Sequence, residues 1–110
     1  MKIAQENKND VVICKIDGEI NISTSPELRK FFDNLVQNKT KKIILDFTSL
    51  SYIDSSGLAT LIELLQRIKK IDGKFYICNM SDKIKNIFEI TKLHKLFEVF
   101  ENQELALNKF

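Results

Sequence analysis

The residues of this 110-residue chain that could do chemistry gather in one short segment, Asp54-Ser55-Ser56-Gly57. The segment directly precedes a stretch with helical apolar spacing, so the sequence predicts a loop that leads into a helix. A serine hydroxyl at a helix start can cap the helix, accept a phosphate or act as a nucleophile. On these four residues alone helix capping is the commoner explanation, because Asp and Ser are preferred cap residues.

The start of a helix also favours negative charge. Its first N–H groups have no partner within the helix, and the positive end of the helix dipole lies there. A phosphate on Ser55 adds about −1.5 to −2 charges, and we expect the domain to tolerate it without unfolding. Gly57, which lacks a Cβ, would permit a tight turn into the helix and close approach by another protein.

A hydrolase is one alternative for the same segment. It would combine Ser55 with His94, the only histidine, and with an aspartate such as Asp46 or Asp54. The GxSxG motif that exposes a nucleophilic serine is missing, and His94 lies in an amphipathic stretch where an exposed or core-edge imidazole is usual. We therefore expect no enzymatic activity.

A second alternative is a receiver-like domain that is phosphorylated on aspartate. Such a domain gathers carboxylates around magnesium at the ends of strands. The candidate carboxylates are Asp17, Glu19, Asp46 and Asp54. Hydroxylamine would distinguish the two cases, because it cleaves an acyl phosphate and leaves a phosphoserine intact.

The cysteine and histidine residues do not indicate a metal-binding site. Cys14 and Cys78 lie in apolar runs, where small core residues are expected, and the chain has one histidine and no CxxC pair. The sequence therefore predicts no metal site and no cofactor.

Strands are predicted where β-branched and aromatic residues cluster. The main runs are residues 11–16, 43–47, 75–78 and 97–100, and residues 1–5 would add a short edge strand before a hairpin turn. The run at 43–47 is nearly continuous in apolar character, which is typical of a strand covered by helices.

Helices are predicted where apolar residues recur every three or four positions. The first begins with a Thr24–Glu27 capping box or with Ser25 before Pro26, and the others begin after Ser55, Ser81 and Asn102. Within the second helix, Glu63 and Arg67 are spaced to pair across one turn. The alternation indicates an α/β fold with a mixed, mostly parallel sheet of four to five strands and about four helices.

Composition indicates a single domain over residues 1–110. The net charge of +2 comes from 17 basic and 15 acidic residues spread along the chain, and Lys39, Lys41 and Lys42 are expected to form a solvated loop. No apolar run is long enough to span a bilayer, and the polar opening differs from a signal peptide. We expect a cytoplasmic protein that binds neither nucleic acid nor membrane.

Most of the chain resembles one family. The order IILDF, LSYIDSSGLATLIELL and a basic helix end resembles the STAS domain of bacterial anti-sigma factor antagonists, and residues 54–57 match that family's phosphorylation motif. The resemblance extends to DGEI at 17–20, to Gly73-Lys74 before FYICNM, and to ITKLHKLFEVF near the end. It implies the STAS fold for the whole chain and favours phosphorylation over simple capping.

The resemblance also implies a regulatory switch. Ser55, the first serine of the motif, would accept phosphate from an anti-sigma factor that is also a serine kinase. The unphosphorylated protein would bind this kinase and release a sigma factor, phosphorylation would block binding, and a serine phosphatase would reset the switch. The expected state is a monomer or a weak dimer. The expected partner-binding residues are Ile20, Asn21, Ser23, Thr24, Asp54, Ser55, Ser56, Gly57 and Leu58.

Asn21 departs from the family pattern, because many relatives have aspartate two residues after the GE pair. A neutral amide can still cap or hydrogen-bond, but it supplies no charge near Ser55. A role in partner choice and a role as a simple turn residue are equally supported by the sequence.

A different function on the same fold is the remaining alternative. STAS domains also occur in anion transporters and as subunits of lipid-trafficking or stress-signalling complexes without a phosphoswitch, and a shared fold does not fix function. The serine at position 55 inside DSSG favours partner switching over this alternative.

Overall fold

The apolar runs of the sequence assemble into one six-stranded sheet in the computed structural model, which describes residues 1–110. The strands are β1 (Lys2–Lys8), β2 (Val11–Ile20), β3 (Lys42–Asp46), β4 (Leu50–Ile53), β5 (Lys74–Cys78) and β6 (Glu98–Phe100). Their order is β1-β2-β3-β5-β6, and β4 pairs with β2 beside this path. Only the β1–β2 pair is antiparallel, so the mixed, mostly parallel sheet is confirmed.

The sheet contains one strand more than the sequence predicted. β4 has only four residues, and its buried ends Leu50 and Ile53 enclose two exposed positions, a pattern too short to show strand periodicity. β2 pairs with β3 as far as Lys15 and with β4 from Gly18 to Ile20, and the β2–β4 register shifts between Gly18 and Glu19. β1 is also longer than expected, because an edge strand with one paired side can be polar over most of its length.

The helices are α1 (Ser25–Gln37), α2 (Ser55–Lys70), α3 (Asp82–Ile90) and α4 (Gln103–Leu107), with a 3₁₀ helix η1 (Leu93–Lys95) before β6. α3 and α4 begin at the predicted caps, and the cap of α2 is Asp54, one of the three cap candidates in its segment. The side chains of Asp54, Ser81 and Asn102 each accept a hydrogen bond from a backbone N–H in the first turn that follows. None of the helices combines the length and apolar character needed to cross a bilayer.

The predicted capping box of α1 is wrong. The residue before the helix is Thr24, but its hydroxyl makes no cap hydrogen bond, and Pro26 in the first turn supplies the start signal instead. The Thr24 hydroxyl donates to the Glu19 carbonyl at 2.8 Å and accepts from the Asn21 N–H at 2.8 Å. It therefore stabilises the loop before the helix.

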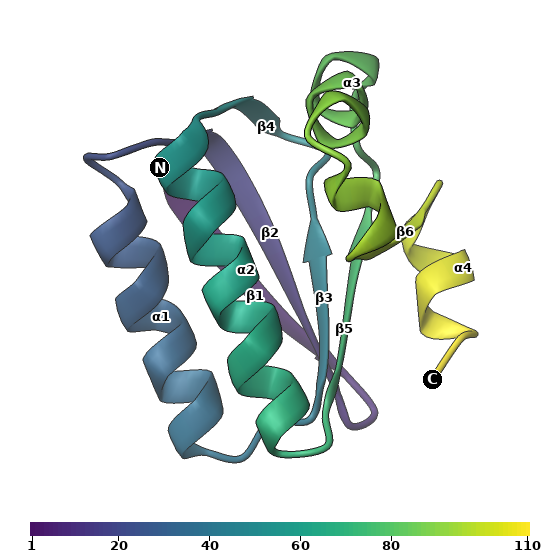
Figure 1. Cartoon of the computed structure of the whole chain (residues 1–110). Helices are drawn as coiled ribbons and strands as arrows, with labels where there is room; N and C mark the ends of the chain where they lie inside the picture. The colour runs from purple at the N-terminus through teal and green to yellow at the C-terminus, as the bar shows by residue number, and fades with distance from the viewer.

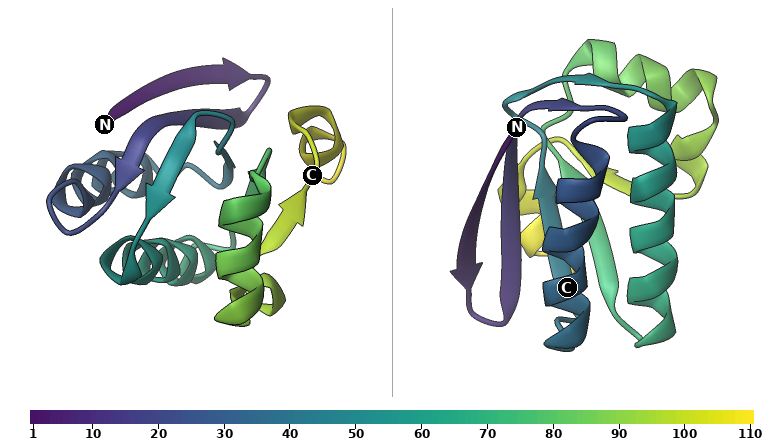
Figure 2. Two further views of the ribbon diagram at one scale, coloured as in Figure 1. Left: turned by 90° about the horizontal axis from the view of Figure 1, so that it is seen from above. Right: turned by 90° about the vertical axis from the view of Figure 1, so that its left-hand side faces the viewer.

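The helices cover the two faces of the sheet unequally (Figures 1 and 2). α1 and α2 lie side by side on one face, over a core of 22 buried residues that includes Phe32, Leu45 and Leu61. The short α4 covers part of the other face, where a cluster of 6 buried residues includes Ile44, Tyr76 and Ala106. Alternating strand residues point to opposite faces, so both clusters come from the same strands.

Candidate functional site

The Asp54–Gly57 segment lies where three chain segments meet: the end of β4, the start of α2, and the loop between β2 and α1. Asp54 joins them. One of its carboxylate oxygens accepts a hydrogen bond from the Gly57 N–H at 3.0 Å, and the other accepts from the Ile22 N–H at 3.2 Å. Its own N–H donates to the Ile20 carbonyl at 3.1 Å. One carboxylate thus caps α2 and fixes the neighbouring loop.

Ser55 is the first residue of α2, and its side chain is exposed. The predicted position at a loop-to-helix junction is confirmed. The first turn of α2 contains no acidic residue, and Asp54 caps only the Gly57 N–H. The junction can therefore accept an added negative charge beside N–H groups and a favourable helix dipole. Ser56, the neighbouring hydroxyl, is half-buried.

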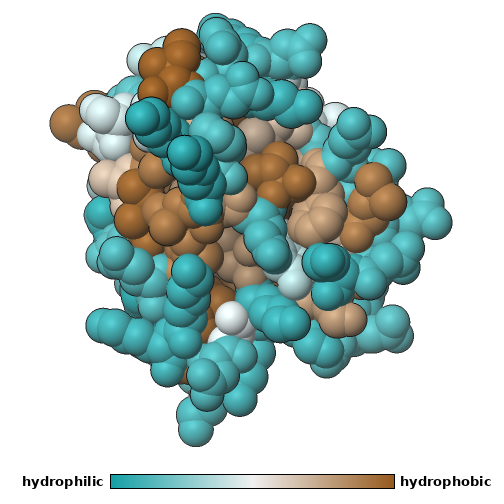
Figure 3. Space-filling view, turned by 45° about the vertical axis from the view of Figure 1, so that its right-hand side comes forward, coloured by the Kyte–Doolittle hydropathy of each residue, from teal (hydrophilic) through white to brown (hydrophobic).

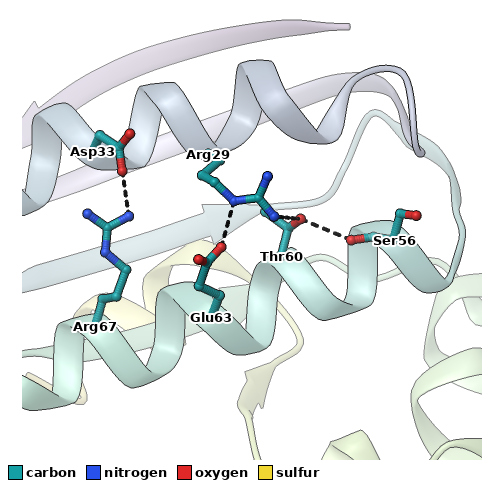
Figure 4. Close-up of polar contacts among 6 residues, drawn as sticks. All are labelled: Arg29, Asp33, Ser56, Thr60, Glu63 and Arg67. Carbon is teal, nitrogen blue, oxygen red and sulfur yellow. Dashed lines mark hydrogen bonds and ion pairs between the residues drawn. The ribbon is translucent and has the colours of Figure 1, made fainter.

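A polar network between α1 and α2 holds this helix in place (Figure 4). Arg29 of α1 donates to the Glu63 carboxylate at 2.7 Å and to the Thr60 hydroxyl at 3.3 Å. The Thr60 hydroxyl in turn donates to the Ser56 carbonyl at 2.9 Å. The network reaches the first turn of α2, so we expect that turn to be well ordered before any partner binds.

The predicted pairing of Glu63 with Arg67 within α2 is wrong. Arg67 bonds instead to Asp33 of α1, and Glu63 bonds to Arg29 of α1. The two helices lie close together, so each charged side chain reaches an opposite charge on the neighbouring helix. Such partners depend on tertiary packing, and spacing within a single helix cannot reveal them.

Asn21 is a turn residue. Its side-chain oxygen accepts hydrogen bonds from the N–H groups of Ser23 and Thr24, at 2.9 and 3.1 Å. A carboxylate could accept the same bonds, so the amide keeps the turn while removing one negative charge from this end of the sheet. The geometry favours the turn role over a direct electrostatic role.

Three of the predicted partner-binding residues are buried. Ile20 has no exposed surface, and Gly57 and Leu58 are also buried, so these three residues offer a partner little contact area. A Cβ at Gly57 would lie 2.7 Å from side-chain carbons of Ile20 and Ile53. The missing Cβ therefore serves the packing of α2 on the sheet and not the approach of another protein. Ser23 and Ser55 are exposed, and Asn21, Thr24, Asp54 and Ser56 are half-buried.

Two exposed apolar side chains lie near Ser55 in the fold. Ile22 is 74% exposed, and its N–H is bonded to the Asp54 carboxylate. Tyr52 of β4 is 40% exposed, and the Lys83 ammonium lies 5.9 Å from the centre of its ring. Ile22 lies within the segment from Ile20 to Ser25 that we expected to contact a partner. Tyr52 was not predicted, because it belongs to the strand that sequence analysis missed.

The structure does not assemble the proposed hydrolase triad. The His94 ring bonds to the Phe88 carbonyl at 3.3 Å, near the end of α3, and makes no hydrogen bond to Ser55 or to an aspartate. Asp46 is buried, and its carboxylate accepts hydrogen bonds from Thr48, Asn79 and Gln103. It joins the ends of β3 and β5 to α4, which is a structural role.

The carboxylates of the proposed receiver-like site do not converge either. No three His, Cys, Asp or Glu side chains lie close enough together to hold a metal ion. Cys14 and Cys78 are free and buried, which confirms their predicted core positions. Burial raises the pKa of each thiol to about 12, with Asp46 as a further cause at Cys78. Both thiols are therefore protonated and unreactive at neutral pH.

Comparisons with known proteins agree with this geometry. The STAS domain family matches residues 2–106. The Anti-sigma-B factor antagonist of Staphylococcus aureus (strain NCTC 8325 / PS 47) is 35% identical over 91 residues, which cover 83% of this chain and 84% of that protein.

Solved structures show the same fold. The crystal structure of tm1081 from Thermotoga maritima matches with a TM-score of 0.93 at 23% identity, over 97% of this chain and 92% of that one. The anti-sigma factor antagonist SpoIIAA matches in its unphosphorylated form with a TM-score of 0.75 at 18% identity, over 98% and 96% of the two chains. Its phosphorylated form gives the same TM-score at 19% identity, over 98% of each chain.

Proposed function

Because the chain belongs to the STAS domain family, we propose that it acts as an anti-sigma factor antagonist whose binding is controlled at Ser55. The unphosphorylated protein binds an anti-sigma factor and thereby frees a sigma factor, and phosphorylation of Ser55 blocks that binding. The observation that carries the proposal is the exposed Ser55 hydroxyl at the first position of α2, on a junction already fixed by Asp54. The name of the Staphylococcus aureus relative supports the function.

The switch works by obstruction and not by refolding. The phosphate adds about −1.5 to −2 charges and considerable bulk to a surface that a partner must desolvate. The α1–α2 network and the Asp54 cap keep the first turn of α2 in place. A loss of about 3 kcal/mol of binding free energy weakens a complex more than a hundredfold, which is enough for a switch. The fold neighbour SpoIIAA exists in both phosphorylation states, and this supports the proposal that the fold tolerates the group.

The docking surface surrounds Ser55 with a few exposed side chains. Ile22 and Tyr52 supply apolar contact area, and Ser23 supplies a polar contact. The buried residues Ile20, Gly57 and Leu58 contribute indirectly, because they pack α2 against the sheet. This docking surface is small and exposed, so a phosphate on Ser55 changes the shape and charge of a large part of it.

The chemistry of the switch belongs to the partners. The anti-sigma factor is also the serine kinase that modifies Ser55, and a serine phosphatase removes the phosphate, while this chain itself catalyses nothing. Because its proposed partners control sigma factors, which act on RNA polymerase in the cytoplasm, we propose a cytoplasmic location for the chain.

The test compares Ser55→Ala with Ser55→Asp for binding to the purified anti-sigma factor by calorimetry. We expect Ser55→Ala to bind like the unmodified protein and Ser55→Asp to bind at least about tenfold more weakly. Asn34→Asp is a matched control, because it adds the same charge to an exposed position on α1. Equal affinities of the two Ser55 variants would contradict the proposal that negative charge at Ser55 blocks binding. Mass spectrometry after incubation with kinase and ATP identifies which serine carries the phosphate. Phosphate on Ser56 alone would show that Ser56, and not Ser55, is the regulatory site.

A further inference from the structure

A second charged feature lies at the opposite end of α2 from Ser55. A groove of about 470 Å³ is lined there by Lys69, Lys74, Lys95 and Lys109 and by one acidic residue, Glu98. Its walls come from the end of α2, the start of β5, η1 and the C-terminal residues. The groove carries an excess of three positive charges, although the whole chain carries only +2. The positive charge of the protein is therefore concentrated here.

The groove lysines have no acidic partner within the chain. The four ion pairs of the structure join Glu6 with Lys8, Glu63 with Arg29, Asp10 with Lys42, and Asp33 with Arg67. None includes a lysine of the groove, although Glu98 lines the same space. Their charges remain available to a ligand from outside.

One side of the groove is the edge of the sheet at the start of β5. β5 pairs with β3 along its whole length, but β6 pairs with it only from Tyr76 to Cys78. Phe75 is only 4% exposed, and its ring packs against Phe97, which directly precedes β6. Lys74 alone therefore lies at an open position of the edge, where its exposed charge can meet a ligand.

The floor of the groove is partly apolar. Leu65, Phe75 and Leu96 line it, and Leu96 is 44% exposed. Figure 3 looks toward this side of the molecule and shows apolar surface lying between hydrophilic side chains. The Tyr76 hydroxyl donates to the Lys109 carbonyl at 3.5 Å, so the C-terminal wall is attached to β5. A ligand that fits this lining carries several negative charges and at least one apolar side chain.

We propose that this groove binds an extended acidic segment of a partner protein. Carboxylates of the segment meet the four lysines, and one apolar side chain lies on the floor. Ser55 and Lys69 are separated by about 21 Å along α2, at 1.5 Å per residue. The groove therefore remains accessible when Ser55 is phosphorylated, and the site does not depend on the function proposed above.

The test uses a fluorescent peptide of alternating Glu and Val around a central Phe, with binding followed by anisotropy and by amide NMR spectra. We expect shift changes at Lys74, Phe75 and Leu96, and weaker binding at higher salt. Lys74→Glu with Lys95→Glu should weaken binding about tenfold. Lys15→Glu with Lys30→Glu, an equal charge change at exposed positions elsewhere, should leave binding unchanged, and so should Ser55→Asp.

Several outcomes would overturn the proposal. Equal weakening by both double variants would show attraction by overall charge only. Tighter binding of an oligothymidylate of matched charge would assign the groove to nucleic acid. Unchanged peptide binding with new self-association of the Lys74 and Lys95 variant would show that the lysines only protect the open edge. If that variant fails to fold, Lys69→Gln with Lys109→Gln replaces it, and unchanged binding by this pair would contradict the proposal equally.

Discussion

The first and last turns of α2 differ in the charged side chains that they carry. At the N-terminal end the first three residues, Ser55, Ser56 and Gly57, are uncharged, and the first turn has no acidic side chain. At the C-terminal end, Arg67, Lys69 and Lys70 lie in the last turn, where positive charge complements the helix dipole. At the C-terminal end three basic side chains stand within the helix itself, whereas at the N-terminal end the only favourable charge is the Asp54 cap, and the first-turn positions of the helix carry none.

The difference indicates where a reversible charge can act. A phosphate at the C-terminal end would oppose the dipole but pair with the lysines, so it would change the existing electrostatics of the fold. A phosphate at Ser55 meets a favourable dipole and exposed surface, so its effect falls on whatever docks there. Phosphorylation of Ser55 should therefore change partner binding without lowering the stability of the fold.

A glycine lies near each end of α2, and replacing either one should affect the fold strongly. A Cβ at Gly57 would lie 2.8 Å from the Ile20 carbonyl, and one at Gly73 would lie 2.9 Å from the Lys41 carbonyl. Gly57→Ala and Gly73→Ala should each destabilise the fold by about 1–3 kcal/mol in urea unfolding, because backbone must move. Only Gly57→Ala should also weaken binding to the anti-sigma factor. Equal loss of binding by both variants would contradict a local docking surface.

The next largest effect concerns the cap of α2. Asp54→Ala removes the acceptor for both the Gly57 and the Ile22 N–H groups and should destabilise the fold by about 1 kcal/mol. Asp54→Asn should have an intermediate effect, because the amide oxygen can keep the Gly57 cap but the amide nitrogen cannot accept from the Ile22 N–H. Asp17→Ala, at an exposed position on β2, is the control for loss of one carboxylate. If Asp54→Ala left thermal stability unchanged, the carboxylate would not be fixing this junction.

The smallest effect compares added negative charge at the two ends. Ser55→Asp should stabilise the fold by about 0.3–1 kcal/mol, whereas Lys69→Glu with Lys70→Glu should destabilise it by a similar amount. High salt should reduce both effects, since the positions are exposed and screened. Thermal unfolding at low and high ionic strength measures this. A destabilising Ser55→Asp would mean that the helix start does not accommodate charge.

Much of the fold could be predicted, because local signals and tertiary structure agree there. The strand over the apolar run at 43–47 and the caps at Ser81 and Asn102 are set by nearby residues, and the structure confirms them. β4 could not be predicted, because a four-residue strand exists only through its pairing with β2. The length of β1 likewise depends on its partner strand.

The candidate site was predictable in position but not in detail. The exposed Ser55 follows from its place at a helix start, a local property. Sequence spacing could not predict which site residues are buried, because burial depends on how α2 packs on the sheet. The buried ones are Ile20, Gly57 and Leu58. The interhelical pairs of Arg29 and Arg67 and the lysine groove are assembled from distant segments and became visible only in three dimensions.

The most direct test measures the anti-sigma factor's affinity for this protein before and after stoichiometric phosphorylation of Ser55, with amide NMR spectra of both forms. We expect an affinity loss of at least about a hundredfold, with spectral changes confined to the start of α2 and the loop before α1. An unchanged affinity, or a loss that comes with changes throughout the sheet, would contradict it.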